Sequence, residues 1–198
     1  MPDMFMLRSD WLPRYKHFTS DAPDTVFTPE KYKKTFAPVV VNDLMLADKI
    51  KAVSYGVPTL GIFYNADMLN QAGITSPPQN WQELVDASSK ITKKSGSNLT
   101  QSGVALGTAS VANASSIMPL LMIQNGATMT NNPPTEATFQ KPASDNYPSS
   151  AKAVDFYTSF AKPGKSTYSW SDGFGESTQA FAGGKTAMII DYPYKYLS

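Results

Sequence analysis

Residues 55–65 read YGVPTLGIFYN, and this stretch decides how the chain is organised. Residues 53–64 as a whole are expected to be extended, but Gly56, Pro58 and Gly61 interrupt regular strand pairing. Such a segment suits a crossover between two lobes. Asn65 then offers a side-chain cap for a short helix, which Gly73 ends.

The rest of the chain alternates expected helices with short apolar strands, which favours an α/β fold. Asn80 and Glu83 form a capping box that predicts a helix through Lys94. Further helices are expected at residues 117–124, 150–162 and 176–182, and buried strands at 4–7, 103–107 and 186–191. We expect the strands near Phe63, Val104 and Thr186 to form a mainly parallel sheet.

Prolines mark the remaining boundaries. Thr28 followed by Pro29 predicts a helix start, and Pro38 should kink or shorten that helix. Residues 131–150 are polar and rich in proline, which predicts a long loop.

Composition excludes several classes of function. A net charge of +1 gives no electrostatic field for a nucleic acid or an anionic membrane. The chain has no cysteine, and His17 is its only histidine, so neither a thiolate metal site nor a Ser/His/Asp triad can be assembled. We therefore expect no metal and no cofactor.

Two features of the sequence suggest catalytic interpretations. Gly184, Lys185 and Thr186 resemble the end of a phosphate loop, but the first glycine of that motif would fall at Gln179, which favours an ordinary turn. A glycosidase needs two carboxylates flanking the scissile bond, and Asp172 and Glu176 are among those available. Any chain of this size offers such pairs by chance.

Aromatic residues beside polar ones carry a stronger signal. Sugar rings pack on Trp or Tyr, and their hydroxyls need polar partners. The sequence places such aromatic residues in loops near strand or helix ends: Trp11 beside Asp10, Trp170 near Asp172, and Tyr194 near Tyr192. Each of these rings could equally pack in a core, and Trp81, inside a helix with apolar companions, is expected to do so.

Several short motifs, in this order and spacing, resemble one family. They are YGVPTLGIFYN with ADML, AGI, PP and WQEL after it, then QSGVALG, QNG and AFAGGKTAM. The chain is similar to bacterial extracellular solute-binding proteins of family 1, the carbohydrate type, which deliver sugars to ABC importers. The resemblance implies a two-lobed periplasmic-binding-protein-like fold of type II. Residues 1–56 would be a remnant of the first lobe and residues 57–198 most of the second.

The resemblance also implies a function and a site. The family captures a sugar or oligosaccharide without chemical reaction, as a monomer that docks on a membrane permease. It is periplasmic or extracellular, and often a lipoprotein. In the first lobe, Asp10 would hydrogen-bond to sugar hydroxyls, with Trp11 beside it. In the second lobe, Asn113 would lie in the cleft loop and Trp170 on the cleft side. Tyr194 would form a wall on which the sugar stacks.

The chain departs from the family in two ways. The family usually carries several more residues between Pro58 and Thr59, often ending in an acidic residue that reaches the ligand. Family members are also much longer, so the chain resembles a central fragment that alone would bind sugar poorly or not at all. Two alternatives stay open. One is a carbohydrate-active enzyme fragment that uses a carboxylate pair, and the other is a degenerate fragment without binding function.

Overall fold

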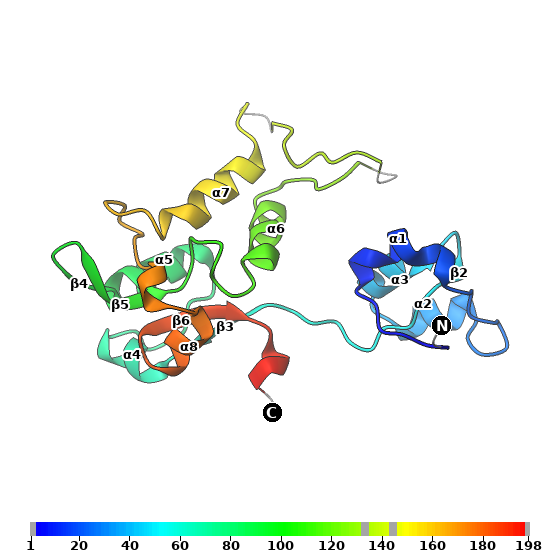
Figure 1. Cartoon of the computed structure of the whole chain (residues 1–198), viewed down its shortest axis with the longest axis horizontal. Coiled ribbons are helices and arrows are strands. Elements are labelled where there is room, and N and C mark those ends of the chain that lie inside the picture. The colour runs from blue at the N-terminus through cyan, green and yellow to red at the C-terminus, as the bar shows by residue number, and fades with distance from the viewer. Residues whose placement is uncertain (1–2, 132–134, 143–145, 197–198) are drawn as a thin grey trace. The chain divides into compact units, whose positions relative to one another are not determined.

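The computed structural model describes residues 3–131, 135–142 and 146–196. The chain forms two compact units, Met1–Pro58 and Thr59–Ser198, each of which is described by itself (Figure 1). The division falls inside the extended stretch that the sequence marks as a crossover. Within the described residues, no helix is long and apolar enough to cross a membrane.

The first unit is built from short helices and one small hairpin. Its elements are η1 (Ser9–Trp11), α1 (Leu12–Tyr15), η2 (Lys16–Phe18), α2 (Pro29–Thr35), α3 (Pro38–Leu44), β1 (Met45–Leu46) and β2 (Lys49–Ile50). Their core consists of buried apolar side chains: Leu12, Tyr32, Val40, Leu44 and Ile50. The Thr28 side chain caps α2 by accepting from the Lys31 amide, and the helix stops before Pro38, as predicted.

The predicted strand at residues 4–7 is wrong. No helix or strand is assigned there, and Met4 and Met6 are exposed. The β1 and β2 strands pair with each other, and no third strand pairs with them in the described part of the unit. A short extended segment without a hydrogen-bonded neighbour does not form a stable strand.

The second unit contains a four-stranded sheet with the order β3-β6-β5-β4. Its strands are β3 (Gly61–Tyr64), β4 (Lys93–Ser95), β5 (Asn98–Val104) and β6 (Thr186–Asp191). Every residue of β6 is buried, as expected for an apolar strand covered on both faces. The strand at 186–191 was therefore predicted correctly, whereas β5 begins earlier than the expected strand at 103–107.

The sheet is mixed, which corrects the expectation of a mainly parallel one. Only the β5–β6 pair is parallel, and β3 and β4 run antiparallel to their neighbours. The polar hairpin of β4 and β5 has no apolar alternation that would have revealed it. Strand direction depends on the path of the connecting chain, which local sequence does not specify.

Helices cover both faces of this sheet (Figure 1). They are α4 (Ala66–Gln71), α5 (Trp81–Ile91), α6 (Ala114–Gln124), α7 (Ser149–Ser159) and α8 (Ser177–Ala182), with the 3-10 turns η3 (Asp172–Phe174) and η4 (Pro193–Tyr196). One core joins Met188 and Ile190 to α5, α6 and α7, and a second joins Ile189 to Ala180 of α8. Ile189 thus faces the layer opposite to that of its neighbours Met188 and Ile190, as side chains alternate along a strand.

The predicted helix starts are largely confirmed. The Asn65 side chain accepts from the Met68 amide at 3.1 Å, and that of Asn80 accepts from the Glu83 amide at 2.9 Å. The α5 helix ends at Ile91, earlier than predicted. Of residues 131–150, the described ones carry one isolated bridge from Ala137 to Thr130, and α7 begins at Ser149; Pro133 and Pro134 lie outside the described residues.

Candidate functional site

Parallel pairing of β5 and β6 brings the carboxyl ends of both strands to one edge of the sheet. Ligand sites of open α/β sheets form at such edges, because the loops that follow the strands converge there. The loop after β5 leads to Asn113, which precedes α6, and the turn after β6 is η4. Both segments carry residues predicted from the sequence to contact ligand.

Asp191, the last residue of β6, is the centre of this edge. Its side chain is 0% exposed. Oδ1 accepts from Asn113 Nδ2 at 2.6 Å and from the Tyr192 amide at 2.7 Å, and it lies 2.8 Å from Lys195 Nζ. Oδ2 accepts from the Tyr196 hydroxyl at 3.0 Å. The carboxylate is therefore fully engaged inside the protein.

Asp191 remains ionised despite its burial. Burial alone would raise its pKa, but the ion pair with Lys195 and the other donors outweigh that cost and hold the pKa below its usual range. Burial, with the negative charge of Asp191 beside the hydroxyl, raises the pKa of Tyr196 to about 12. The hydroxyl of Tyr196 therefore stays protonated and serves as a donor.

The turn after β6 presents an aromatic surface. The Tyr192 and Tyr194 rings stack with centroids 5.7 Å apart and an interplanar angle of 19°. The Tyr196 ring packs on Phe63 of β3 at 4.4 Å. Tyr194 is 59% exposed, so its ring is available to a ligand.

The loop from β5 to α6 is held by hydrogen bonds to residues of four other elements. The Tyr157 hydroxyl donates to the Thr108 carbonyl at 2.8 Å, and the Asp172 carboxylate accepts from the Thr108 and Ser110 hydroxyls at 2.8 and 2.5 Å. The Ala112 amide donates to the Ser177 hydroxyl at 2.9 Å, and Asn113 is held by Asp191. A loop fixed at this many points is preorganised for binding.

Asn113 adopts a left-handed backbone conformation with φ 58°, which asparagine tolerates better than most residues. Its side chain does not cap α6 and instead reaches across to β6, where its Oδ1 also lies 3.4 Å from Lys195 Nζ. The sequence-based prediction of Asn113 therefore falls on a residue of this edge.

Trp170 lies in a different environment from the one expected. Its side chain is 0% exposed, and its ring stacks on Phe174 at 5.4 Å within the core between β6 and α8. A ring without exposed surface is not available to stack on a ligand in this structure. The environment of Trp170 is that of a core residue, which is the alternative given above for each aromatic residue.

Asp10 and Trp11 belong to the first unit. Arg8 makes a two-pronged interaction with Asp10, with Nε 3.0 Å from Oδ1 and Nη2 2.8 Å from Oδ2, and this hydrogen bonding holds the pKa of Asp10 below its usual range. Trp11 is 51% exposed, with its ring 6.1 Å from that of Tyr15. Both side chains lie at the surface of their unit, and their approach to Asn113 and Tyr194 stays a prediction.

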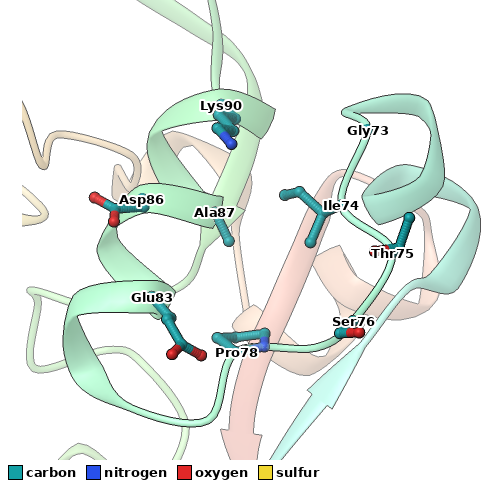
Figure 2. A pocket seen from close by; sticks show the side chains of 9 residues that line it. All are labelled: Gly73, Ile74, Thr75, Ser76, Pro78, Glu83, Asp86, Ala87 and Lys90. Atoms are coloured by element: carbon teal, nitrogen blue, oxygen red, sulfur yellow. The ribbon is translucent and has the colours of Figure 1, made fainter.

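Two surface pockets lie on the second unit. The first, of about 370 Å³, lies between α5 and the turn from Gly73 to Pro78 (Figure 2). Its Glu83 carboxylate already accepts from the Gln79 amide at 2.7 Å and so belongs to the helix cap. The second, of about 360 Å³, is lined by Leu60, Trp81 and Ile190, and the Trp81 indole donates to Gln124 at 2.8 Å.

Sequence reasoning missed Asp191, Lys195 and Tyr196. From the sequence, Asp191 is the polar end of an apolar strand. A signal was present, because the buried strand ends in a carboxylate and aromatic residues follow it. The spacing of Asp191 and Lys195 also suits an ion pair across one turn.

The carboxyl groups bear on the glycosidase alternative. A general acid needs a raised pKa. Among the described residues, each carboxyl whose pKa departs clearly from its usual range departs downward: Asp10, Asp48, Asp172, Glu176 and Asp191. Asp172 is engaged by two hydroxyls, and Glu176 caps α8 through the Gln179 amide.

The chain was compared with known proteins. The family model described as "Bacterial extracellular solute-binding protein" matches residues 2–198. A protein of Brucella abortus (strain 2308), named only as a binding protein, is 25% identical over 96 residues, which are 48% of this chain and 23% of that protein.

Solved structures resemble this one in fold. A cyclic alpha-maltosyl-1,6-maltose binding protein from Arthrobacter globiformis has a TM-score of 0.71 at 18% identity, covering 94% of this chain and 45% of its own. The maltose-bound MalE3 of T. maritima has a TM-score of 0.68 at 17% identity, and the match covers 95% of this chain and 45% of that chain. A solute-binding protein of Thermotoga lettingae bound with alpha-D-tagatose has a TM-score of 0.63 at 20% identity, with 94% and 46% covered. The chain thus spans less than half of the length of each.

Proposed function

Because the chain belongs to the bacterial extracellular solute-binding protein family, we propose that it supplies part of the binding site with which such a protein captures a sugar or oligosaccharide for an ABC importer. The units Met1–Pro58 and Thr59–Ser198 would then be parts of the first and second lobes. The protein acts outside the cytoplasm, docks on a membrane permease, works as a monomer and is anchored as a lipoprotein.

One observation carries the proposal. The exposed Tyr194 ring lies at the carboxyl end of β6, on a turn that Asp191 ties to Asn113 of the neighbouring loop. A sugar site needs an aromatic face with hydrogen-bonding groups beside it, and this edge supplies both. Asp10 and Trp11 would contribute from the first unit.

The choice of ligand class is supported by the similar solved proteins, whose names mention maltose, tagatose and mannobiose. The Asp172 carboxylate accepts from the Thr108 and Ser110 hydroxyls, and Glu176 accepts from the Gln179 amide, so both carboxylates are engaged within the protein. No bond of the ligand is made or broken in this proposal.

The test is a saturation-transfer NMR titration of the chain with maltose, mannobiose and tagatose, which detects weak binding. Tyr194→Ala should lower the affinity by about 1 to 3 kcal/mol, the scale of a lost aromatic contact. Tyr168→Ala is the matched control, because Tyr168 is a partly exposed ring under Lys94, outside the proposed site. Equal affinity in the wild type and Tyr194→Ala would remove Tyr194 from the site.

A further inference from the structure

The turn that carries Tyr194 is held on both sides of that residue by one buried group. Before it, the Tyr192 amide donates to Asp191 at 2.7 Å. After it, Lys195 forms an ion pair with Asp191 at 2.8 Å, and the Tyr196 hydroxyl donates to Asp191 at 3.0 Å. Tyr194 lies between these contacts and stays exposed.

The same carboxylate holds the neighbouring loop. Asn113 Nδ2 donates to Asp191 at 2.6 Å and also lies 3.5 Å from the Ile190 carbonyl. The β5–β6 pairing brings together the segments that carry Asn113 and Tyr194. Asp191 ties both segments, and Lys195 Nζ also lies 3.4 Å from Asn113 Oδ1.

We propose that Asp191 is a positioning residue, whose buried carboxylate fixes the Tyr194 ring and the Asn113 side chain relative to each other. The assignment of a ligand to these two side chains rests on the proposed function. Asp191 has no exposed surface and so acts through its neighbours rather than by touching ligand. Its hydrogen bonds have an ionised acceptor and are therefore of the stronger, charge-assisted kind, which suits them to hold a fixed geometry.

An ionised residue at this buried position costs free energy, and a role in positioning its neighbours explains why it is there. A carboxylate removed from water costs free energy unless several donors compensate it, and here four groups do so. An apolar side chain at the end of β6 would fill the same place in the core without that cost. It would leave the Lys195, Tyr196 and Asn113 side chains without their acceptor.

The first experiment needs no sugar. In two-dimensional NMR spectra of the labelled chain, Asp191→Asn should move the side-chain amide signals of Asn113 and the backbone amide of Tyr194, while signals of α5 and β4 stay in place. Asp86→Asn, which makes the same change on the surface of α5, is the matched control. Unchanged Asn113 and Tyr194 signals in Asp191→Asn would overturn the proposal.

A second variant covers the case in which Asp191→Asn does not fold. Tyr196→Phe removes only the hydroxyl donor and keeps the ring on Phe63. It should move the Tyr194 and Asn113 signals in the same direction but by less, and the absence of any shift there would overturn the proposal.

The second experiment adds ligand. Asp191→Asn should weaken maltose binding about tenfold, the effect of losing one hydrogen bond to a charged group. Because Asp191 acts through Tyr194, adding Asp191→Asn to Tyr194→Ala should cause little further loss. Full additivity of the two effects would show that Asp191 acts independently and would contradict the positioning role. If the spectra of Asp191→Asn shift as expected but maltose shifts only signals away from Asn113 and Tyr194, the proposed function fails and the positioning role stands.

Discussion

The Asn113 side-chain amide donates to Oδ1 of Asp191 at 2.6 Å, although 78 positions separate the two residues in the sequence. The contact exists because β5 and β6 run parallel, so the segments that follow them meet at one edge of the sheet. Asn113 also has a left-handed backbone, with φ 58°. Asparagine at this position therefore serves both a side-chain hydrogen bond and a left-handed backbone.

Two substitutions separate the contribution of the hydrogen bond to stability from that of the backbone conformation. Asn113→Ala should lower the free energy of unfolding by about 1.5 to 3 kcal/mol for the lost bond to a charged group, with about 1 kcal/mol more for the left-handed backbone. Asn113→Gly loses the same bond but adopts this backbone freely, so it should be the more stable variant. Urea unfolding measures both, and a glycine variant less stable than the alanine variant would contradict the account.

The second prediction concerns acid stability. The folded pKa of Asp191 lies below its usual range, so its contribution to stability is present above the unfolded pKa of about 3.9 and is lost as the pH falls through the folded value. Asp191→Asn does not titrate at this position. The stability difference between wild type and Asp191→Asn should therefore shrink from pH 7 to pH 3 in urea unfolding. A difference that grew toward low pH would show that Asp191 is not an ionised, stabilised group.

The third prediction concerns the packing of β5 on α5. A Cβ added at Gly103 would lie 2.2 Å from the Ser88 carbonyl oxygen, a backbone atom that cannot turn away. Gly103→Ala should therefore cost about 1 to 3 kcal/mol of stability, the usual range for overpacking. Gly61→Ala is the matched control on β3, because nothing lies within 4 Å of its added Cβ. Equal stability of the two variants would refute the close approach.

Local sequence signals predicted the local structure well. The Thr28, Asn65 and Asn80 caps and the β6 strand follow from side chains that act within a few residues of themselves. The extended stretch before β3 was also recognisable, because Gly56 and Pro58 break regular pairing.

Features that depend on distant partners were not predictable in this way. Among the residues that the structure describes, no segment pairs with the strand expected at residues 4–7. The direction of β3 relative to β6 is set by the path of the chain. Trp170 carries the same local signal as an exposed sugar-stacking ring, but the surrounding core buries it. Asp191 showed its importance only when its four partners were brought together by the fold.

The most direct test of the central claim is to map where sugar touches the chain. In a titration of the isotope-labelled chain with maltose, the account predicts that the largest amide shifts occur at Asn113 and in η4, around Tyr194. Because the chain spans less than half of the length of the similar sugar binders, we expect a dissociation constant of about 1 mM or weaker, equivalent to about −4 kcal/mol. Shifts confined to another surface, such as the α5 pocket, or micromolar binding with Asn113 and Tyr194 unaffected, would contradict the account.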